Sequence, residues 1–214
     1  IEAGREKMIG AICESPMTIR SIINWKDAIK DGTMLLRDIV DLEATYDMSD
    51  ISESKLEDTF KNYGETGNAK TRTYVHNFDE SKFYNVPAGE FTDWRDLPYD
   101  TDLLFYEGLH GAAKFENINI SKYTDLKIGV VPVINLEWIQ KIHRDTDARG
   151  YTTEAVTDTI LRRMHDYVHC ICPQFTETDI NFQRVPVVDT SNPFIARWIP
   201  TADESIVVIR FKDP

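Results

Sequence analysis

The sequence has few cysteines, no long hydrophobic run and no excess of positive charge. Its three cysteines, Cys13, Cys170 and Cys172, are too few for a disulfide framework, which fits a reducing compartment such as the cytoplasm. The longest apolar runs, such as residues 128–134, fall well short of the roughly 18 residues that span a bilayer. No apolar stretch follows a basic amino terminus, so a secretory signal is not visible. These absences exclude a membrane protein.

Acidic residues outnumber basic ones, with 36 Asp and Glu against 24 Lys and Arg, and the formal net charge is −12. A field of that sign repels nucleic acid, so nucleic acid is excluded as a partner. Any phosphate-bearing ligand must then be small and held by a local group of cations. The chain begins with Ile1 instead of methionine, which indicates a processed or incomplete product.

The first fifty residues have a different pattern of apolar and polar residues from the rest of the chain. Residues 19–29 predict a short amphipathic helix that breaks near Asp31 and Gly32. Thr33 is expected to cap a second helix with Leu35, Leu36, Ile39 and Val40 on one side. We therefore treat residues 1–52 as a helical segment without an assigned function, and residues 53–214 as one domain.

Strand and helix signals alternate in the rest of the chain. Helices are predicted over residues 56–63 (ending at Gly64), 135–145 and 152–170. Strands are predicted over residues 103–106, 126–133 and 205–210. Apolar runs that are each followed by helical sequence are typical of buried, parallel strands. The sequence therefore predicts an α/β fold, in which helices flank a mixed, mainly parallel sheet.

Glu107 follows the apolar strand 103–106. An acid at the carboxyl end of such a strand points into the crevice where open α/β sheets bind ligands, and it can hold Mg²⁺ directly or through water. The alternative is a carboxylate that only caps the following turn.

The predicted helix 135–145 is amphipathic. Its apolar side carries Leu136, Ile139, Ile142 and His143, and its polar side carries Glu137, Lys141, Arg144 and Asp145. Arg149 follows just beyond the helix. Such a face can bind anionic oxygens, because an arginine guanidinium binds them in bidentate fashion and the lysine ammonium acts as a point charge. The alternative is a solvated face of ordinary ion pairs.

Other polar groups carry weaker signals. Arg162 and Arg163 lie in a helix where one can follow the core boundary while the other faces solvent. Arg72 and His76 lie in a basic loop that either meets a sugar phosphate or is simply hydrated. Zinc binding is disfavoured at the group His165, His169, Cys170 and Cys172, because Cys-x-Cys is a poor chelating spacing. The sequence contains neither a G-x-x-x-x-G-K-[ST] phosphate loop nor G-x-G-x-x-G.

Several long motifs resemble the phosphoribulokinase family of the bacterial type, over residues 56–213. They are YGETG (63–67), TRTYVH (71–76), FTDWRDL (91–97), LLFYEGLHG (103–111), VVPVINLEWIQKIHRDTDARGYTTEAV (130–156), ILRRMHDYV (160–168) and INFQRVPVVDTSNPF (180–194). The resemblance implies a fold related to nucleoside monophosphate kinases. It also implies the ATP-dependent conversion of ribulose 5-phosphate to ribulose 1,5-bisphosphate in the Calvin cycle, with Mg²⁺, by a cytoplasmic homo-oligomer.

The resemblance also implies roles for single residues. Glu107 corresponds to the acid near the metal and phosphates, Lys141 and Arg144 to the cations that stabilise the transferring phosphoryl group, and Asp145 to their acidic neighbour. Arg149 and His76 correspond to sugar-phosphate ligands. The pair Arg162 and Arg163 implies phosphate or effector electrostatics, and Arg210 lies where relatives activated by NADH could bind their effector.

The chain departs from the family pattern at its amino-terminal end. Family members begin with a strand, a glycine-rich phosphate loop and a helix, followed by an Asp-x-x-His segment that supplies the catalytic base. Residues 1–50 match none of these parts, and residues 17–25 read MTIRSIINW. From this pattern we expect weak or no kinase activity. The alternative function is a non-catalytic module that binds a sugar phosphate or a partner.

Overall fold

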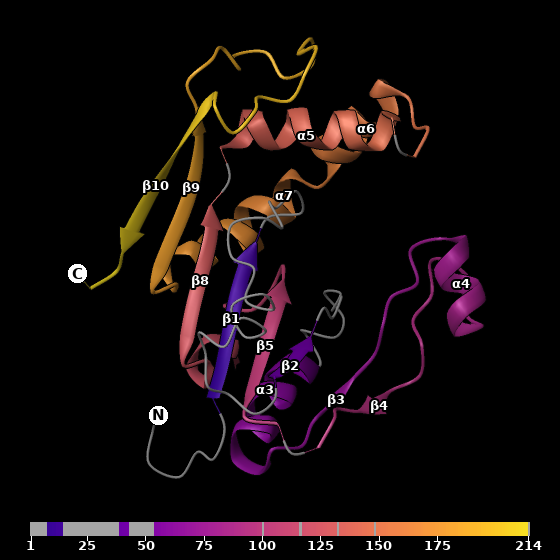
Figure 1. Cartoon of the computed structure of the whole chain (residues 1–214), viewed down its shortest axis with the longest axis vertical. Helices are drawn as coiled ribbons and strands as arrows, with labels where there is room; N and C mark the ends of the chain where they lie inside the picture. The colour runs from indigo at the N-terminus through magenta and orange to yellow at the C-terminus, as the bar shows by residue number, and fades with distance from the viewer. Residues whose placement is uncertain are drawn as a thin grey trace.

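A six-stranded sheet forms the centre of the molecule (Figure 1). The computed structural model describes residues 8–14, 39–42, 54–99, 101–115, 117–131, 133–147 and 149–213. The strands, in spatial order, are β10 (Ser205–Phe211), β9 (Ile180–Pro186), β8 (Leu126–Val131), β1 (Met8–Glu14), β5 (Leu103–Gly108) and β2 (Ile39–Leu42). Neighbouring strands are parallel except for β10, which is antiparallel to β9. The predicted α/β fold with a mixed, mainly parallel sheet is confirmed.

Two strands of this sheet come from the first fifty residues. Strand β1 lies between β5 and β8, so that Gly10 stands opposite both Phe105 and Leu126. The prediction of a helix through Ile39 and Val40 is wrong, because both residues lie in β2, which pairs with β5. β-branched side chains fit a strand well, and pairing with β5 outweighs the helical spacing. The predicted helix over residues 19–29 lies outside the described residues.

The helices are α3 (Lys55–Thr66), α4 (Phe78–Tyr84), α5 (Ile134–Asp147), α6 (Thr153–Arg162) and α7 (Met164–Asp166). The helices predicted over residues 56–63, 135–145 and 152–170 lie where α3, α5 and α6 are found, with different ends, whereas α4 was not predicted. Helix α3 runs past Gly64 and ends at Gly67, whose φ of 74° is left-handed and suits glycine. The single helix predicted over residues 152–170 is interrupted, because α6 and α7 are followed by a π-helical turn, Tyr167–Ile171, and a 3-10 turn, Cys172–Thr176.

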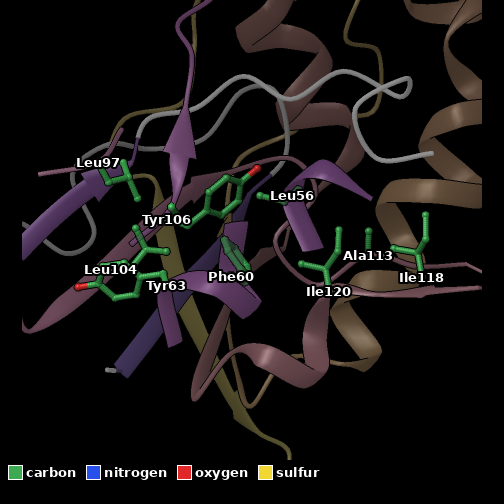
Figure 2. Close-up of a cluster of buried hydrophobic side chains, with 10 residues drawn as sticks. Leu56, Phe60, Tyr63, Leu97, Leu104, Tyr106, Ala113, Ile118 and Ile120 are labelled. Carbon is green, nitrogen blue, oxygen red and sulfur yellow. The ribbon is translucent and has the colours of Figure 1, made fainter. Parts of the chain in front are cut away.

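A hydrophobic core joins α3 to the sheet (Figure 2). Leu56, Phe60 and Tyr63 of α3 are fully buried together with Leu104 and Tyr106 of β5. The rings of Phe60 and Tyr106 meet edge to face, with their centroids 5.3 Å apart. Burial of these side chains fixes β5, and therefore fixes the strand end from which Glu107 projects.

The remaining short elements form an arm and a small hairpin. Strands β3 (Lys70–Thr71) and β4 (Arg95–Asp96) pair antiparallel. The segment that they enclose, residues 70–96, is called the arm, and it carries α4 away from the sheet (Figure 1). Asn77 caps α4 by accepting a hydrogen bond from the backbone N–H of Glu80. A second hairpin joins β6 (Lys114–Phe115) to β7 (Ile118–Asn119) and leads into a 3-10 turn, Ile120–Tyr123.

Helices α5 and α6 lie across the end of the sheet to which the arrowheads of β8, β1 and β5 point (Figure 1). The chain passes from the carboxyl end of β8 at Val131 into α5 at Ile134, so the helix begins at this edge. In open α/β sheets ligands bind outside the carboxyl ends of the strands. None of the helices that the structure describes is long and apolar enough to cross a membrane.

Candidate functional site

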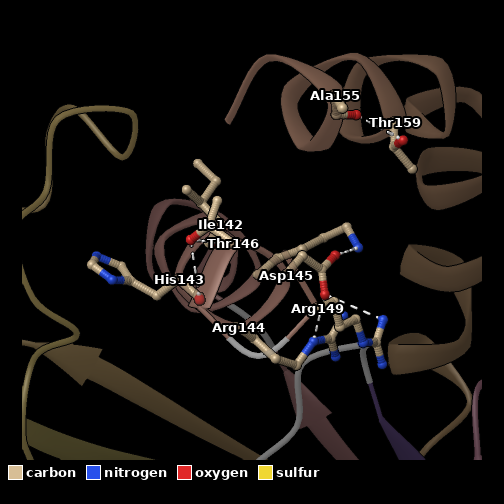
Figure 3. Close-up of polar contacts among 9 residues, drawn as sticks. Ile142, His143, Arg144, Asp145, Thr146, Arg149, Ala155 and Thr159 are labelled. Carbon is tan, nitrogen blue, oxygen red and sulfur yellow. Dashed lines mark hydrogen bonds and ion pairs between the residues drawn. The ribbon is translucent and has the colours of Figure 1, made fainter. Parts of the chain in front are cut away.

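Three cations converge on one buried carboxylate at the end of α5 (Figure 3). The Lys141 ammonium lies 2.7 Å from Oδ2 of Asp145. The other carboxylate oxygen, Oδ1, accepts a hydrogen bond from Nε of Arg144 at 2.8 Å and lies 3.2 Å from Nη1 of Arg149. We call these four residues the Asp145 cluster. It contains three cations for one carboxylate, so it is locally positive in a chain whose net charge is −12.

The end of α5 brings Arg149 back toward the helix. Gly150 has a φ of 71°, its N–H bonds to the carbonyl of Thr146, and the N–H of Tyr151 bonds to the carbonyl of Asp145. The bond from the left-handed Gly150 to the carbonyl four residues earlier is the αL ending of a helix. The reversal places the Arg149 guanidinium beside a carboxylate four residues earlier, and the cations also lie where the negative end of the helix dipole favours them.

Burial distinguishes this arrangement from an ordinary solvated helix face. The Asp145 side chain is only 6% exposed, whereas those of Lys141, Arg144 and Arg149 are 22%, 34% and 49% exposed. Burial raises the pKa of Asp145, but hydrogen bonds from Arg144 and Lys141 outweigh it, so the pKa lies below its ordinary value. The acid is therefore ionised and covered, while the cations remain partly exposed.

Glu107 lies at the carboxyl end of β5, as the sequence predicts, and is partly buried. Among the described residues, no ion pair or side-chain hydrogen bond joins it to the Asp145 cluster. The loop that follows Glu107 is held by Gln174, which the sequence reasoning missed. Its buried amide donates to the carbonyls of Leu109 and Cys170, and its oxygen accepts from the N–H of Ala112.

His76 lies on the arm and not beside α5. Its Nδ1 is 3.3 Å from Oε2 of Glu80, which also accepts a hydrogen bond from the His76 backbone N–H. Its ring packs edge to face on Tyr74. On the same arm the Arg72 guanidinium lies 3.8 Å from the centre of the Phe91 ring. Within the described part of the chain, the ion-pair partner of His76 is Glu80 of the same arm, so the geometry leaves His76 apart from the Asp145 cluster.

The other predicted cations lie on exposed surfaces. Arg162 and Arg163 lie at the exposed carboxyl end of α6, so neither follows the core boundary. Helix α6 itself packs on α5 through Ile142, Val156 and Ile160. Arg210 is exposed on the outermost strand, β10, in register with Asn181 of β9. Within the described residues, none of these three arginines forms an ion pair.

The fold and the cluster define a class of protein. A mainly parallel sheet with cations gathered beyond its carboxyl edge is an open α/β architecture whose charged groups lie where such sheets bind their ligands. The profile of the Phosphoribulokinase / Uridine kinase family matches residues 20–191. The chain belongs to this family.

Curated relatives and a solved structure agree with this assignment. The chain is 70% identical over 161 residues to a phosphoribulokinase of Nitrobacter vulgaris, which covers 75% of this chain and 56% of the relative. It is 69% identical over 170 residues to phosphoribulokinase 1 of Cereibacter sphaeroides, which covers 79% of this chain and 58% of the relative. The solved phosphoribulokinase from Rhodobacter spheroides superposes with a TM-score of 0.79 at 50% identity, over 99% of this chain and 82% of that one. The matched part therefore spans a little more than half the length of the curated relatives.

The lowered pKa of Asp145 predicts a pH-dependent contribution to stability. A carboxyl whose pKa falls on folding stabilises the folded state above its unfolded pKa, and this contribution is lost as the pH drops through the folded pKa. Asp145→Asn should lower the free energy of unfolding by about 1–3 kcal/mol near neutral pH, since it leaves three cations without their shared acceptor. The difference from wild type should be constant above about pH 5 and shrink below about pH 4. Urea unfolding of both proteins at a series of pH values, from neutral to below about pH 4, measures this difference in the free energy of unfolding.

Asp147→Asn is the matched control, because the Asp147 side chain on the same helix is 77% exposed. It should change the free energy of unfolding by less than about 0.5 kcal/mol at every pH. A difference between Asp145→Asn and wild type that grows on acidification would contradict the role given to Asp145.

Proposed function

We propose that the chain phosphorylates ribulose 5-phosphate with ATP to give ribulose 1,5-bisphosphate, the reaction after which its phosphoribulokinase relatives are named. The observation that carries the proposal is the Asp145 cluster, which supplies three converging cations beyond the carboxyl edge of the sheet. Its residues lie in the segment that is 70% identical to a phosphoribulokinase. We also propose that the reaction belongs to the Calvin cycle and takes place in the cytoplasm, as the resemblance to phosphoribulokinases implies.

The chemistry requires alignment and charge neutralisation more than covalent help. A hydroxyl oxygen of the sugar attacks the γ-phosphorus of ATP and loses its proton to solvent, the bond to the β–γ bridging oxygen breaks, and ADP leaves. In our proposal Lys141 and Arg144 donate to the transferring oxygens, where charge builds up in the transition state. Arg149, the most exposed of the three cations, holds the 5-phosphate of the sugar. Asp145 orients all three and contacts neither substrate.

Glu107 is the residue that we propose as a ligand for Mg²⁺. Magnesium sites in kinases use one or two carboxylates together with oxygens of the substrate phosphates. Among the described residues no group of three His, Cys, Asp or Glu side chains could hold a metal. A single carboxylate at a strand end therefore fits a metal that arrives with the nucleotide. When bound, magnesium neutralises charge on the phosphates.

We assign weaker roles to the remaining predicted residues. His76 would contact the sugar phosphate only if the arm that carries it approaches α5. Arg162 and Arg163 would bind phosphate or an anionic effector at the exposed end of α6, and Arg210 an effector such as NADH on β10. We also propose that copies of the chain form a homo-oligomer by pairing along the outer edge of β10. Its Ile206, Val207 and Ile209 are each half-exposed, and an apolar edge strand favours pairing with another copy.

A second candidate function is a module that binds the sugar phosphate without transferring a phosphoryl group. The observation that favours it lies in the sequence after β1. Phosphate-binding α/β proteins place a glycine-rich loop after the first strand, where backbone N–H groups cradle the phosphates. Residues 15–21, which follow β1, read SPMTIRS and contain no glycine. Binding and transfer must therefore be measured separately.

Arg149→Ala tests the proposed sugar-phosphate site. Because the variant removes a charge-assisted contact, the dissociation constant of ribulose 5-phosphate should rise about tenfold or more. Binding by the wild-type protein should also weaken as salt is added. Isothermal titration calorimetry measures both effects. Arg197→Ala, at an exposed arginine of the loop between β9 and β10, is the control and should bind like wild type. Unchanged binding by Arg149→Ala would remove the assignment.

Lys141→Met separates transfer from binding. If Lys141 stabilises the transferring group, the variant should form ribulose 1,5-bisphosphate at least about a hundredfold more slowly than wild type, with the fold intact. The assay couples ADP release to product analysis, and circular dichroism checks folding. Lys82→Met, on the exposed face of α4, is the control. A wild-type chain that binds the sugar phosphate but forms no product favours the binding module. Full activity of Lys141→Met would contradict the role of Lys141.

A further inference from the structure

Glu107 lies at a point where β5 is paired on one side instead of two. Strand β2 pairs with β5 as far as Tyr106 and then ends. Within the described residues, the neighbour that still pairs with β5 at this point is β1, whose Ile12 stands opposite Glu107. A metal ligand must be held within about 0.5 Å of its working position. The segment after Glu107 must therefore be held by contacts from elsewhere in the fold.

The first of these contacts is made by Gly108, the last residue of β5. The Tyr106 hydroxyl lies 2.5 Å from the position that a Cβ atom of residue 108 would occupy. A larger side chain would displace Tyr106, which is fully buried in the core, so the position requires glycine. This close packing fixes the end of the strand but does not reach the turn that follows, residues 109–112.

The second contact is made by Gln174, which spans that turn. Its Nε2 donates hydrogen bonds to the carbonyls of Leu109 and Cys170, at 2.7 and 2.8 Å. Its Oε1 accepts a hydrogen bond of 3.1 Å from the backbone N–H of Ala112. Both N–H groups of the amide and its oxygen are thus engaged. The side chain is only 3% exposed, so water has little access to replace these bonds.

The position of these bonds indicates more than the satisfaction of buried backbone groups. One amide holds the first and the last residue of the turn, and so determines how the chain leaves Glu107 two residues earlier. The third bond, to Cys170, ties the same amide to the preceding turn of its own segment. The turn after Glu107 is therefore fastened to a part of the fold that lies 60 or more residues further along the chain.

We propose that Gln174 is a positioning residue, which holds the turn 109–112 so that the carboxylate of Glu107 stays in place to bind magnesium. The inference rests on the proposed function, because it assumes that Glu107 is the metal ligand. Gln174 contacts neither the metal nor a substrate and acts through Glu107. The Asp145 cluster is built from residues 141–149, so loss of the Gln174 amide should leave the sugar-phosphate site unchanged.

Gln174→Met tests the proposal, because methionine has a similar shape but cannot make the three hydrogen bonds. Two affinities are measured: that of Mn²⁺ with a non-hydrolysable ATP analogue, by electron paramagnetic resonance, and that of ribulose 5-phosphate, by calorimetry. The dissociation constant of Mn²⁺ should rise about tenfold, the effect expected when the support of a metal ligand is lost. The dissociation constant of ribulose 5-phosphate should not change. A general loosening of the fold would weaken both.

A double variant shows whether Gln174 acts through Glu107. Glu107→Gln removes the charge of the proposed ligand, and adding Gln174→Met to it should weaken Mn²⁺ binding no further. Thr176→Val is the matched control. Thr176 is exposed in the same 3-10 turn, and its hydroxyl bonds to the carbonyl of Pro173 within that turn. The control should bind both ligands like wild type.

A measurement on the free protein needs no ligand. The order parameter of the Glu107 backbone N–H, from ¹⁵N relaxation, should be near the rigid value of about 0.85 in wild type and lower in Gln174→Met. If Gln174→Met does not fold, Gln174→Asn takes its place, since its shorter amide cannot span the turn.

Three results would overturn the proposal: an unchanged order parameter of Glu107, equal weakening of both ligands, or additive losses of Mn²⁺ affinity in the double variant. Failure of the wild-type chain to bind Mn²⁺ with the nucleotide analogue would instead refute the metal site of the proposed function. The order parameter of Glu107 would still decide whether Gln174 holds it.

Discussion

Three cationic side chains near the end of one helix repel one another, and the carboxylate of Asp145 is the group that lets them share a small volume. Each of its oxygens is engaged, with Lys141 on one and two arginines on the other. Because the acid is buried and the cations are partly exposed, the excess positive charge lies on the solvent side of the cluster. A mobile phosphate can then meet cations that are already ordered, so that less conformational entropy is lost on binding.

The rest of the fold serves to place this helix end. Packing of α3 on β5 fixes the strand that carries Glu107, and the direct passage from β8 into α5 starts the cation-bearing helix at the same edge of the sheet. The segment from Tyr167 to Gln174 contacts both parts, through Glu137 on α5 and through the loop after Glu107. The same segment therefore supports both the loop after Glu107 and the helix that carries the Asp145 cluster.

Local sequence patterns predict much of the fold and of the candidate site, whereas the rest depends on long-range contacts. The apolar stripe of α5 and the apolar runs of β5 and β8 allowed these elements and the polar face to be predicted from the sequence. Strand β2 was mistaken for a helix, since a short run such as Ile39–Leu42 fits either structure until β5 pairs with it. Asp145 is buried although the helical spacing places it on the polar side of α5. The contacts of Tyr167 with Glu137 and of Gln174 with Leu109 span 30 and 65 residues, and no local pattern reports them.

The most direct test of the central claim is the affinity of Asp145→Asn for ribulose 5-phosphate, measured by calorimetry at neutral pH beside wild type. The variant is more positive by one charge, so simple attraction would make it bind the anion more tightly. If Asp145 instead orders the three cations, binding should weaken by at least about threefold despite the added charge. Equal or tighter binding would contradict the account.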